Sequence, residues 1–493
     1  MNYDAFARLN IVRKIIDNLS PGIGQIGGIW LPLPHLLLLP FIRNDFLWHS
    51  GLAGAIVSTS AFVAAALYLE KTALMITKSL RASLAVWFIF VTNQNVLLFQ
   101  TSAMSESFFL CSIIMVMFFL TKWAKSQNTI HLLTAALWVM ISTLTRYEGY
   151  FVLLGSFLTV TTILFLLYGR KNMALIEGTS LLFFTIASYG IFLWCVYCML
   201  FFKDPLYWLH FYTQPKAVQT VSISQAPTTG NIFESFLTYS QASIWMSGII
   251  NSIYGIAGYM LLVMLLVKKI KKKENITAYL SVFIIGSALF LLLVFGYKKG
   301  FIPLIDHPEI NIPNLFNKTL NVYHDWRSTN IRYGLIMVPF LALFSGFVAV
   351  RSRILFIIMI IFISFQLYTN LFTPLYLQFS ISKAQAFVEV VPATWLQSQY
   401  CQGLILVSAR THEDLIFQTK LPYKYFIHEG TKHYWTDSLN DPAKYATWVI
   451  YSDHILEEDR LPNLLTPNAY EVLQKKFLLV YQDNKGFKIF KRI

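Results

Sequence analysis

Residues 277–297 read TAYLSVFIIGSALFLLLVFGY, a stretch of 21 positions without a charged side chain. An α-helix of about 20 apolar residues is long enough to cross the hydrocarbon core of a lipid bilayer. Just before this stretch, the chain carries five lysines between positions 268 and 273. The pattern predicts a membrane-spanning helix that begins next to a strongly basic loop.

Further apolar runs resemble this one. They lie at 51–69, 82–99, 104–121, 131–145, 149–168, 176–202, 244–267, 333–350 and 354–373. Of the 493 residues, 56% are hydrophobic and 13% are charged, which leaves too little polar surface for several soluble domains. We therefore predict an α-helical polytopic membrane protein with about ten spans.

The loops between these runs differ in charge. Short alternate loops, which include the lysine-rich loop, hold 14 basic residues, whereas the other loops hold eight in a longer total length. Because Lys and Arg concentrate on the cytoplasmic side, we expect the second set of loops and both termini to lie outside the cytoplasm. That set comprises 100–103, 146–148, 203–243 and 298–332. The net charge of +14 then reflects membrane topology, and no nucleic-acid partner is indicated.

The first 50 residues contain two membrane-associated elements. Residues 4–19 place Phe6, Leu9 and Val12 on one face, which predicts an amphipathic helix in the membrane interface. Trp30–Phe41 is apolar but carries three prolines, which indicates a re-entrant or interfacial element. No signal peptide is visible, and an extracytoplasmic segment of this kind normally follows a hydrophobic helix. We therefore expect a first span upstream of the given start.

Near residue 380 the composition becomes that of a soluble protein. Residues 403–409, 425–428 and 448–451 read as strands, 411–419 as a helix and 477–491 as a hairpin. We predict three parts: an extracytoplasmic first loop with juxtamembrane helices (1–50), a transmembrane bundle (51–379) and a small extracytoplasmic α/β domain (380–493).

Two acidic residues lie near the outer ends of these elements. Ionisable groups at membrane depth are costly, so they are functional candidates. Asp4 precedes the amphipathic helix, where an N-cap is the alternative interpretation. Glu106 opens a span and, with Ser105, has a capping alternative. The polar stretch Asn93-Gln94-Asn95 near the same edge favours a wet pocket.

Two arginines lie on the same side. Arg146, in the turn Thr145-Arg146-Tyr147-Glu148-Gly149, suits a bidentate bond to phosphate. The alternative is that it snorkels to lipid headgroups. Arg332 leads into a span and is a second candidate for a phosphate.

Other polar residues could contact a substrate. Asp325 follows His324 and suits a sugar or a metal. A divalent metal is the weaker interpretation, because the spacing fits no compact ligand motif, and no other cofactor is indicated. Asp204 and Tyr207 follow the sixth span, where a simple turn anchored by Tyr207 is the alternative.

All these groups fall on one side of the membrane in the topology that loop charge predicts. A carboxylate beside arginines at the lipid boundary suits transfer from a phosphate leaving group. The carboxylate takes the proton of the acceptor hydroxyl, and the cations hold the departing phosphate.

At these residues the chain resembles the glycosyltransferase C superfamily. The resemblance is to its prokaryotic polyprenyl-phosphate-sugar-dependent transferases, related to protein O-mannosyltransferases and aminoarabinose transferases, and it covers most of the chain. The matching pieces are Asp4-Ala5, Arg8-Leu9-Asn10-Ile11, Trp30-Leu31-Pro32-Leu33-Pro34-His35, Ser105-Glu106, Thr145-Arg146-Tyr147-Glu148-Gly149, Asp204-Pro205-Leu206-Tyr207 and Arg332-Tyr333-Gly334.

The resemblance implies a hexosyltransferase, similar to a mannosyltransferase, in the prokaryotic plasma membrane. Its donor is a polyprenyl-phosphate-linked sugar, its acceptor an unknown glycan, lipid or protein outside the cytoplasm, and its reaction inverting. Asp4 becomes the general base and Glu106 a second acidic site residue. The donor or phosphate contacts become Arg146, Arg332, Arg8 and His35. The possible substrate contacts are Asp204, Tyr207, Asp325 and Tyr333.

Two other functions remain open. A secondary transporter suits a bundle with buried charges, but the sequence has no inverted halves and no matching pair of Gly/Pro-broken spans. A non-catalytic membrane scaffold predicts instead that Asp4, Glu106 and Arg146 can each be replaced without loss.

Overall fold

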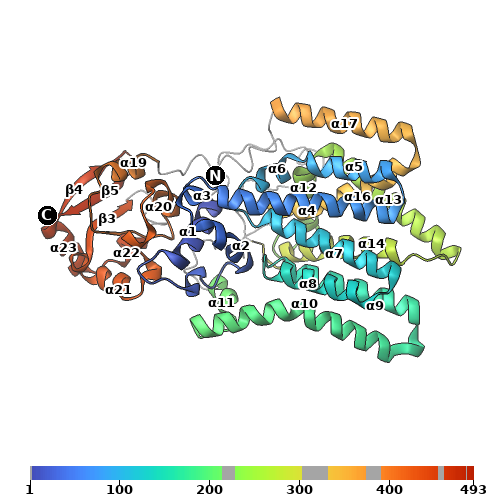
Figure 1. Ribbon diagram of the computed structural model, residues 1–493, viewed down its shortest axis with the longest axis horizontal. Coiled ribbons are helices and arrows are strands. Elements are labelled where there is room, and N and C mark those ends of the chain that lie inside the picture. The colour runs from blue at the N-terminus through green and yellow to red at the C-terminus, as the bar shows by residue number, and fades with distance from the viewer. Residues whose placement is uncertain (1–2, 214–227, 303–330, 373–389, 453–459, 485) are drawn as a thin grey trace.

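The computed structural model describes residues 3–213, 228–302, 331–372, 390–452, 460–484 and 486–493. The molecule is elongated, with a bundle of long helices at one end and a small α/β domain at the other (Figure 1). The N-terminal segment lies between them and contacts both. The two parts therefore meet around the first 50 residues.

The bundle consists mainly of helices that run along the long axis. These helices are α4 (Leu52–Thr77), α5 (Leu80–Val91), α6 (Gln94–Gln100), α7 (Glu106–Ser126), α8 (Thr129–Thr143), α9 (Gly149–Tyr168), α10 (Met173–Phe202), α12 (Ile232–Ser247), α13 (Ile249–Lys271), α14 (Thr277–Lys298), α16 (Val338–Arg351) and α17 (Arg353–Phe372). Three short helical elements accompany them: η2 (Arg170–Asn172), α11 (Tyr207–Thr213) and η5 (Ile331–Met337).

Each predicted apolar run falls on one or two of these helices. Within the described ranges, seven helices have the length and composition of a membrane span, or eight if the bent pair α5–α6 counts as one. Helices α8 and α17 are apolar but shorter. The chain is thus an α-helical polytopic membrane protein, as predicted.

Two of the predicted spans are not continuous helices. The run 82–99 bends by 61° between α5 and α6, at Thr92 and Asn93. The run 244–267 includes a break at Gly248, between α12 and α13. In the first case Asn93 accepts a hydrogen bond from the Val96 amide and starts a new helix, so a local cap overrides the apolar pattern.

The centre of the bundle is formed by α7 and α16. In their most apolar windows, 78% and 83% of the residues are buried, against 28% for α10 at the edge. Glycines allow close approach here: a Cβ atom on Gly258 of α13 would lie 1.8 Å from the carbonyl oxygen of Phe344 in α16. Small residues thus determine how closely these helices pack.

The C-terminal domain has one five-stranded sheet of order β2-β1-β3-β5-β4. Its strands are β1 (Leu404–Leu406), β2 (Phe426–Ile427), β3 (Ala446–Ser452), β4 (Phe477–Gln482) and β5 (Phe487–Arg492). Strand β1 pairs in parallel with β2 and β3, and β5 pairs antiparallel with β3 and β4. Its helices are α19 (Val390–Gln399), α20 (Glu413–Thr419), α21 (His433–Asn440), α22 (Arg460–Leu464) and α23 (Pro467–Lys476).

The strands, helix and hairpin predicted for this domain are all present; β1, β2 and α20 are shorter than predicted, and β3 is longer. Helices α19, α21, α22 and α23 were not predicted. The predicted domain boundary near 380 falls at 373–389, outside the described residues.

The N-terminal segment contains α1 (Tyr3–Ile16), η1 (Ile23–Ile26), α2 (Leu33–Ile42) and α3 (Asp45–His49). Helix α1 contacts α2 on one side and α20 of the C-terminal domain on the other. Leu9 and Val12 are fully buried, and the ring of Phe6 lies 4.9 Å from that of Phe417. The prediction that the apolar face of this helix meets lipid is therefore wrong, because that face packs against protein.

Candidate active site

Asp4, near the start of the chain, forms an ion pair with Arg332 of the bundle. Asp4 lies in the first turn of α1, where the helix dipole favours a negative charge. Arg332 lies in η5, 328 residues later, and its Nη1 donates to Asp4 Oδ2 at 2.9 Å. The side chains are 31% and 20% exposed, so the pair lies at the edge of the protein interior.

Glu106 lies near the same nitrogen of Arg332. It occupies the first turn of α7 and is only 5% exposed. Arg332 Nη1 is 3.8 Å from Glu106 Oε1, and Arg146 Nη1 is 3.0 Å from the same oxygen. Glu106 is thus buried and lies close to two arginines, and this burial favours a functional role over a simple helix cap.

Arg146 is held by protein groups. It lies in the turn between α8 and α9, and its Nη2 is 2.6 Å from Glu148 Oε1. It also donates to Ser105 Oγ at 3.2 Å, and its Cζ lies 5.7 Å from the ring of Tyr333. These contacts direct the guanidinium into the cluster, in place of the snorkelling alternative.

Arg8 and His35 form a second layer. The Cζ of Arg8 lies 4.6 Å from the Trp30 ring centre, and the Trp30 and His35 rings are stacked 6.0 Å apart. His35 Nδ1 is 3.0 Å from the carbonyl oxygen of Leu31, while Nε2 is buried with no hydrogen-bond partner in the part of the chain that the structure describes.

Burial, with a contribution from the charge of Arg8, lowers the pKa of His35 to about 3, so the ring is neutral. A neutral ring that donates from Nδ1 to a carbonyl can only accept at Nε2. This geometry suits a hydroxyl group better than the phosphate contact predicted for His35.

The charges of the cluster nearly balance. Three arginines (Arg8, Arg146 and Arg332) face three carboxylates (Asp4, Glu106 and Glu148). Burial acts to raise the pKa of Asp4, but the charges of Arg332, Arg8 and Arg146 together outweigh it and hold the pKa below its ordinary value. Asp4 is therefore ionised at neutral pH and able to accept a proton.

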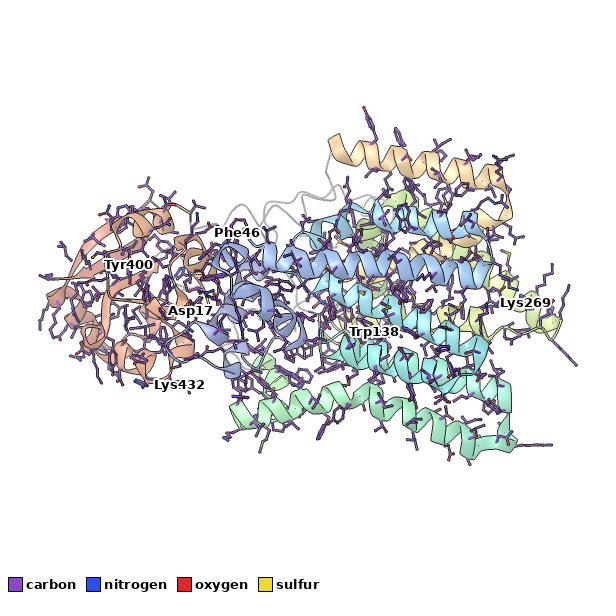
Figure 2. The ribbon with its side chains drawn as sticks, in the orientation of Figure 1. Asp17, Phe46, Trp138, Lys269, Tyr400 and Lys432 are labelled. Atoms are coloured by element: carbon purple, nitrogen blue, oxygen red, sulfur yellow. The ribbon has the colours of Figure 1, made fainter. Side chains whose placement is uncertain are left out.

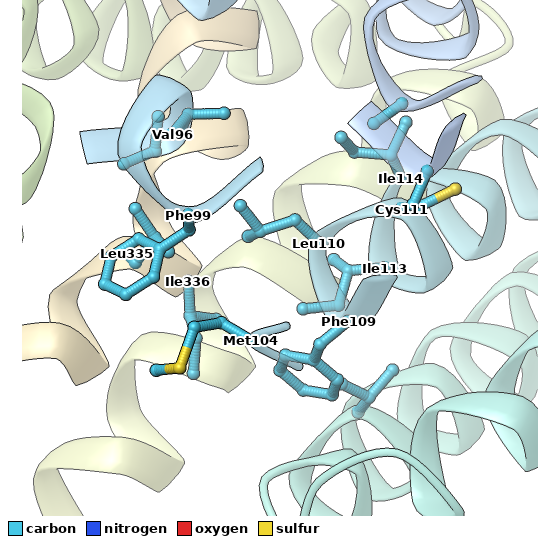
Figure 3. Packing of buried hydrophobic residues seen from close by; sticks show 14 of the residues in the cluster. Val96, Phe99, Met104, Phe109, Leu110, Cys111, Ile113, Ile114, Leu335 and Ile336 are labelled. Carbon is cyan, nitrogen blue, oxygen red and sulfur yellow. The ribbon is translucent and has the colours of Figure 1, made fainter. Parts of the chain in front are cut away.

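A narrow cavity opens beside the cluster. Charged side chains of Glu106, Arg146, Glu148 and Arg332 line one part, and Phe109, Leu110, Leu335 and Ile336 line the rest. Figure 3 shows Phe109 and Leu110 of α7 in one apolar cluster with Leu335 and Ile336 of η5. A charged head beside apolar walls is the surface expected for a lipid with a phosphate group.

The predicted substrate residues Asp204 and Tyr207 have other partners. Asp204 Oδ2 is 2.6 Å from His210 Nδ1, and Oδ1 accepts from the Leu206 amide at 3.0 Å. Tyr207 stacks on Phe202, and a Cβ atom on Gly28 would lie 2.4 Å from its ring. Asp204 therefore stabilises the turn after α10, and Tyr207 packs this turn against the N-terminal segment. Asp325, like His324, lies outside the described residues.

The described residues fit arginine-bound carboxylates better than a metal centre. Among them, no three His, Cys, Asp or Glu side chains lie close enough together to hold a metal ion. A divalent cation would have to compete with Arg332 for Asp4 and Glu106.

Three neighbours of the cluster were not predicted as site residues: Glu148, Ser105 and Trp30. Glu148 lies two positions after Arg146 in the same turn, so this short spacing in the sequence could have indicated that the two side chains meet. Trp30 meets Arg8 only through tertiary packing, which no local pattern indicates.

Comparison with known proteins adds information about the fold. No protein-family model and no curated protein sequence matches the chain. Among solved structures, the chain is similar to the archaeal oligosaccharyltransferase AglB from Archaeoglobus fulgidus in complex with an inhibitory peptide and a dolichol-phosphate. The TM-score is 0.50 at 10% identity, over 100% of this chain and 70% of that one.

The chain has a glycosyltransferase-C-like fold. Two other structures of the Archaeoglobus fulgidus oligosaccharyltransferase match less well. The complex with Zn and sulfate has a TM-score of 0.47 at 10% identity, over 99% of this chain and 69% of that one. The apo form has a TM-score of 0.46 at 9% identity, over 100% of this chain and 71% of that one. The first of these three structures agrees with the fold that the resemblance implies, whereas membership of the glycosyltransferase C superfamily and of its subgroup stays a prediction.

Proposed function

We propose that the protein is a membrane glycosyltransferase that moves a hexose-type sugar from a polyprenyl-phosphate donor to an acceptor outside the cytoplasm. The observation that carries this proposal is the position of Arg332 between Asp4 and Glu106, with Arg146 alongside, at an amphipathic cavity. The fold adds support, since the similar oligosaccharyltransferase was solved with a dolichol-phosphate.

The chemistry follows from the charges. The acceptor oxygen forms a bond to the anomeric carbon while the bond from that carbon to the phosphate oxygen breaks. Asp4 takes the proton of the acceptor hydroxyl, and the electron pair leaves with the polyprenyl phosphate, whose negative charge Arg332 and Arg146 stabilise. A single displacement inverts the configuration at the anomeric carbon.

Arg332 has a second role in this proposal. In the structure it donates to Asp4, which keeps the carboxylate a weak base. The bound donor is a phosphodiester with one negative charge, as a carboxylate has, but the departing polyprenyl phosphate is a monoester with a larger charge and a third acceptor oxygen. It therefore competes for the same guanidinium group as the bond to the sugar breaks. When Arg332 turns to the phosphate, the pKa of Asp4 rises and the carboxylate becomes a stronger base as the acceptor loses its proton.

We assign residues 1–50 and 51–379 to the chemistry, and residues 380–493 to holding α1 in place. The prokaryotic plasma membrane is the proposed location, with the site and the C-terminal domain outside the cytoplasm. The lysine-rich loop supports this orientation, because Lys269 lies at the end of the bundle opposite the C-terminal domain (Figure 2).

The test is sugar transfer by the purified protein in lipid nanodiscs, with polyprenyl phosphates that carry radiolabelled hexoses. The wild type should release polyprenyl phosphate from at least one donor. Asp4→Asn should reduce the turnover by about 10²–10⁴-fold, the contribution of a general base, while Glu471→Gln, an exposed change in the C-terminal domain, serves as the matched control. Full turnover by a folded Asp4→Asn protein would exclude this role for Asp4, and no release from any donor would favour a transporter or scaffold.

A further inference from the structure

Two breaks in transmembrane helices meet at a second cavity. One is the 61° bend between α5 and α6, at Thr92 and Asn93. The other is the break between α12 and α13 at Gly248, whose φ of +88° favours glycine. The cavity is lined by Thr92, Asn93, Gln94, Asn95, Trp245, Met246, Ser247, Gly248, Asn251, Ile363, Gln366 and Leu367.

Amide side chains connect the two breaks. Asn93 Nδ2 donates to the carbonyl oxygens of Met246 and Ser247 at 3.0 and 3.2 Å, and Asn95 Nδ2 donates to that of Met246 at 3.1 Å. Asn251 Nδ2 donates to the Ser247 carbonyl at 2.8 Å. Because each nitrogen must face a carbonyl oxygen, the orientation of each amide group is determined, and its oxygen is an acceptor.

Several oxygen atoms at this cavity are left over. Asn95 Oδ1, Asn251 Oδ1, Ser247 Oγ and Gln94 Oε1 are buried and have no hydrogen-bond partner within the described residues. The first three belong to residues that are only 1–3% exposed. An unpaired buried polar atom costs roughly 1–3 kcal/mol, so four acceptors at one cavity indicate a bound group that the oxygens surround.

The unpaired oxygens dominate the electrostatics of this cavity. The C-terminal ends of α5 and α12 and the N-terminal ends of α6 and α13 all lie at it, so the partial charges of the helix ends largely cancel. Among the described residues that line it there is no Lys, Arg or His, and the oxygens therefore favour a positive charge. Unwound backbone and half-helix C-termini coordinate Na⁺ in other membrane proteins.

The residues that line the cavity also determine which charge of ion it can hold. Among those that the structure describes there is no Asp or Glu, so the oxygens are neutral. A divalent cation would lack charge compensation in a site of this kind, whereas a monovalent ion needs only neutral oxygen ligands. The narrow space favours the smaller alkali ion.

We propose that this cavity binds one sodium ion, held by side-chain oxygens of Asn95, Ser247, Asn251 and Gln94. The ion links the α5–α6 break to the α12–α13 break and stabilises both. The site is separate from the carboxylate–arginine cluster, and it does not depend on the proposed transferase function.

The direct test is binding of ²²Na⁺ to the full chain in nanodiscs. Saturable binding of one ion per chain is expected, and the melting temperature should rise by about 2 °C or more when sodium chloride replaces N-methyl-D-glucamine chloride at constant ionic strength. Absence of saturable binding together with an unchanged melting temperature would mean that the cavity holds water only, and would overturn the proposal.

Variants test the individual ligands. Ser247→Ala should weaken sodium binding by about tenfold or more, because it removes one of the four side-chain oxygens that bind the charged ion. Gln94→Glu should tighten it at neutral pH and lose that gain on acidification, as the new carboxyl group takes a proton. Asn251 is kept as it is, because its Nδ2 donates to the Ser247 carbonyl. Ser156→Ala is the matched control, since Ser156 in α9 is fully buried, its hydroxyl group has no hydrogen-bond partner among the described residues, and it does not line this cavity.

If Ser247→Ala fails to fold, Gln94→Glu still decides the question. Its proposed effect is a gain, which misfolding cannot imitate. A Gln94→Glu protein that folds and binds sodium as the wild type does would overturn the assignment of Gln94 as a ligand.

Discussion

At the scale of single residues, Arg332 carries the most specific prediction. Its Nη1 lies 2.9 Å from Asp4 and 3.8 Å from Glu106, and the other nitrogens of its guanidinium group can bind a phosphate in the bidentate geometry that a single ammonium cannot provide. We expect Arg332→Lys to reduce kcat/KM for the lipid-linked donor by about tenfold or more. Steady-state kinetics of sugar transfer in nanodiscs measure kcat/KM for both proteins.

The control for this variant is Arg353→Lys, an exposed change at the start of α17, which should leave transfer unchanged. If Arg332→Lys transfers sugar at the wild-type rate and with the wild-type KM, Arg332 neither bridges the carboxylates nor holds the phosphate during the reaction.

Sequence patterns indicated the residues of the cluster better than their partners. Hydropathy marks charged residues at the ends of spans, so Asp4, Glu106, Arg146 and Arg332 were identified, and the structure brings these four together. Their roles remain predictions. Hydropathy gave the same weight to Asp204, which pairs with its neighbour His210, because position relative to the membrane does not determine which side chains meet.

At the scale of elements, the contact between α1 and α20 links the helix that carries Asp4 to the C-terminal domain. Lys14 Nζ is 2.8 Å from Glu413 Oε1, and the side chains are 10% and 7% exposed. Asn10 Nδ2 and the Tyr423 hydroxyl donate to Glu413 Oε2 at 2.8 and 3.1 Å. This buried network fixes α1, and with it Asp4, against the domain.

Breaking this ion pair should loosen α1. Lys14→Met leaves Glu413 buried and unpaired, at a cost of about 3–5 kcal/mol, and we expect a lower melting temperature and slower sugar transfer. The double variant Lys14→Met/Glu413→Met should recover much of the stability. Differential scanning fluorimetry compares the three proteins, with Lys475→Met at an exposed pair as the control. A single variant as stable as the wild type would contradict this account.

The same interface should respond to pH through His428. Its Nδ1 accepts from the Gly430 amide at 3.1 Å, and Nε2 lies 3.2 Å from Asn18 Oδ1, so both nitrogens are used by the neutral ring. Burial, followed by the charge of Lys14, holds the pKa of His428 well below its ordinary value of 6.5.

The sign of the effect follows from proton binding. Below about pH 6.5 the unfolded chain binds a proton at this residue and the folded chain does not. Stability from His428 is therefore fully present above pH 6.5 and is lost as the pH falls toward the depressed pKa. Melting temperatures at pH 7.5 and 5.5 test this, and the difference should shrink in His428→Asn. An equal difference in that variant would assign the pH dependence to other groups.

Elements differ in how well the sequence predicted them. Apolar length found the spans, and alternation found the strands of the C-terminal domain, because both signals are local. The amphipathic pattern of α1 correctly gave a helix but wrongly gave lipid as its partner. The apolar face of a helix indicates that it is covered, but not whether lipid or protein covers it. Here Phe417 and other residues of the C-terminal domain do so.

At the scale of the whole molecule, charge and architecture agree. The lysine-rich loop after α13, marked by Lys269, lies at one end of the bundle, and the C-terminal domain lies beyond the other end (Figures 1 and 2). Asp4 of the cluster lies on α1, which contacts α20 of that domain. Local hydropathy predicted this division, whereas the packing of the domain onto α1 depends on residues about 400 positions apart, such as Asn10 and Glu413. Contacts at that separation leave no local pattern.

The orientation itself can be tested with cysteines. Cys401 is exposed in the C-terminal domain, whereas Cys111 and Cys198 are buried in the bundle. A membrane-impermeant maleimide should therefore label Cys401 on intact spheroplasts. In a Cys401→Ser background, a cysteine introduced by Lys272→Cys should react only after the membrane is opened, because the lysine-rich loop faces the cytoplasm in the proposed topology. A permeant maleimide controls for reactivity at both positions. Labelling of the Lys272→Cys protein from outside would invert the topology and place the arginine–carboxylate cluster in the cytoplasm, where an acceptor outside the cell could not reach it.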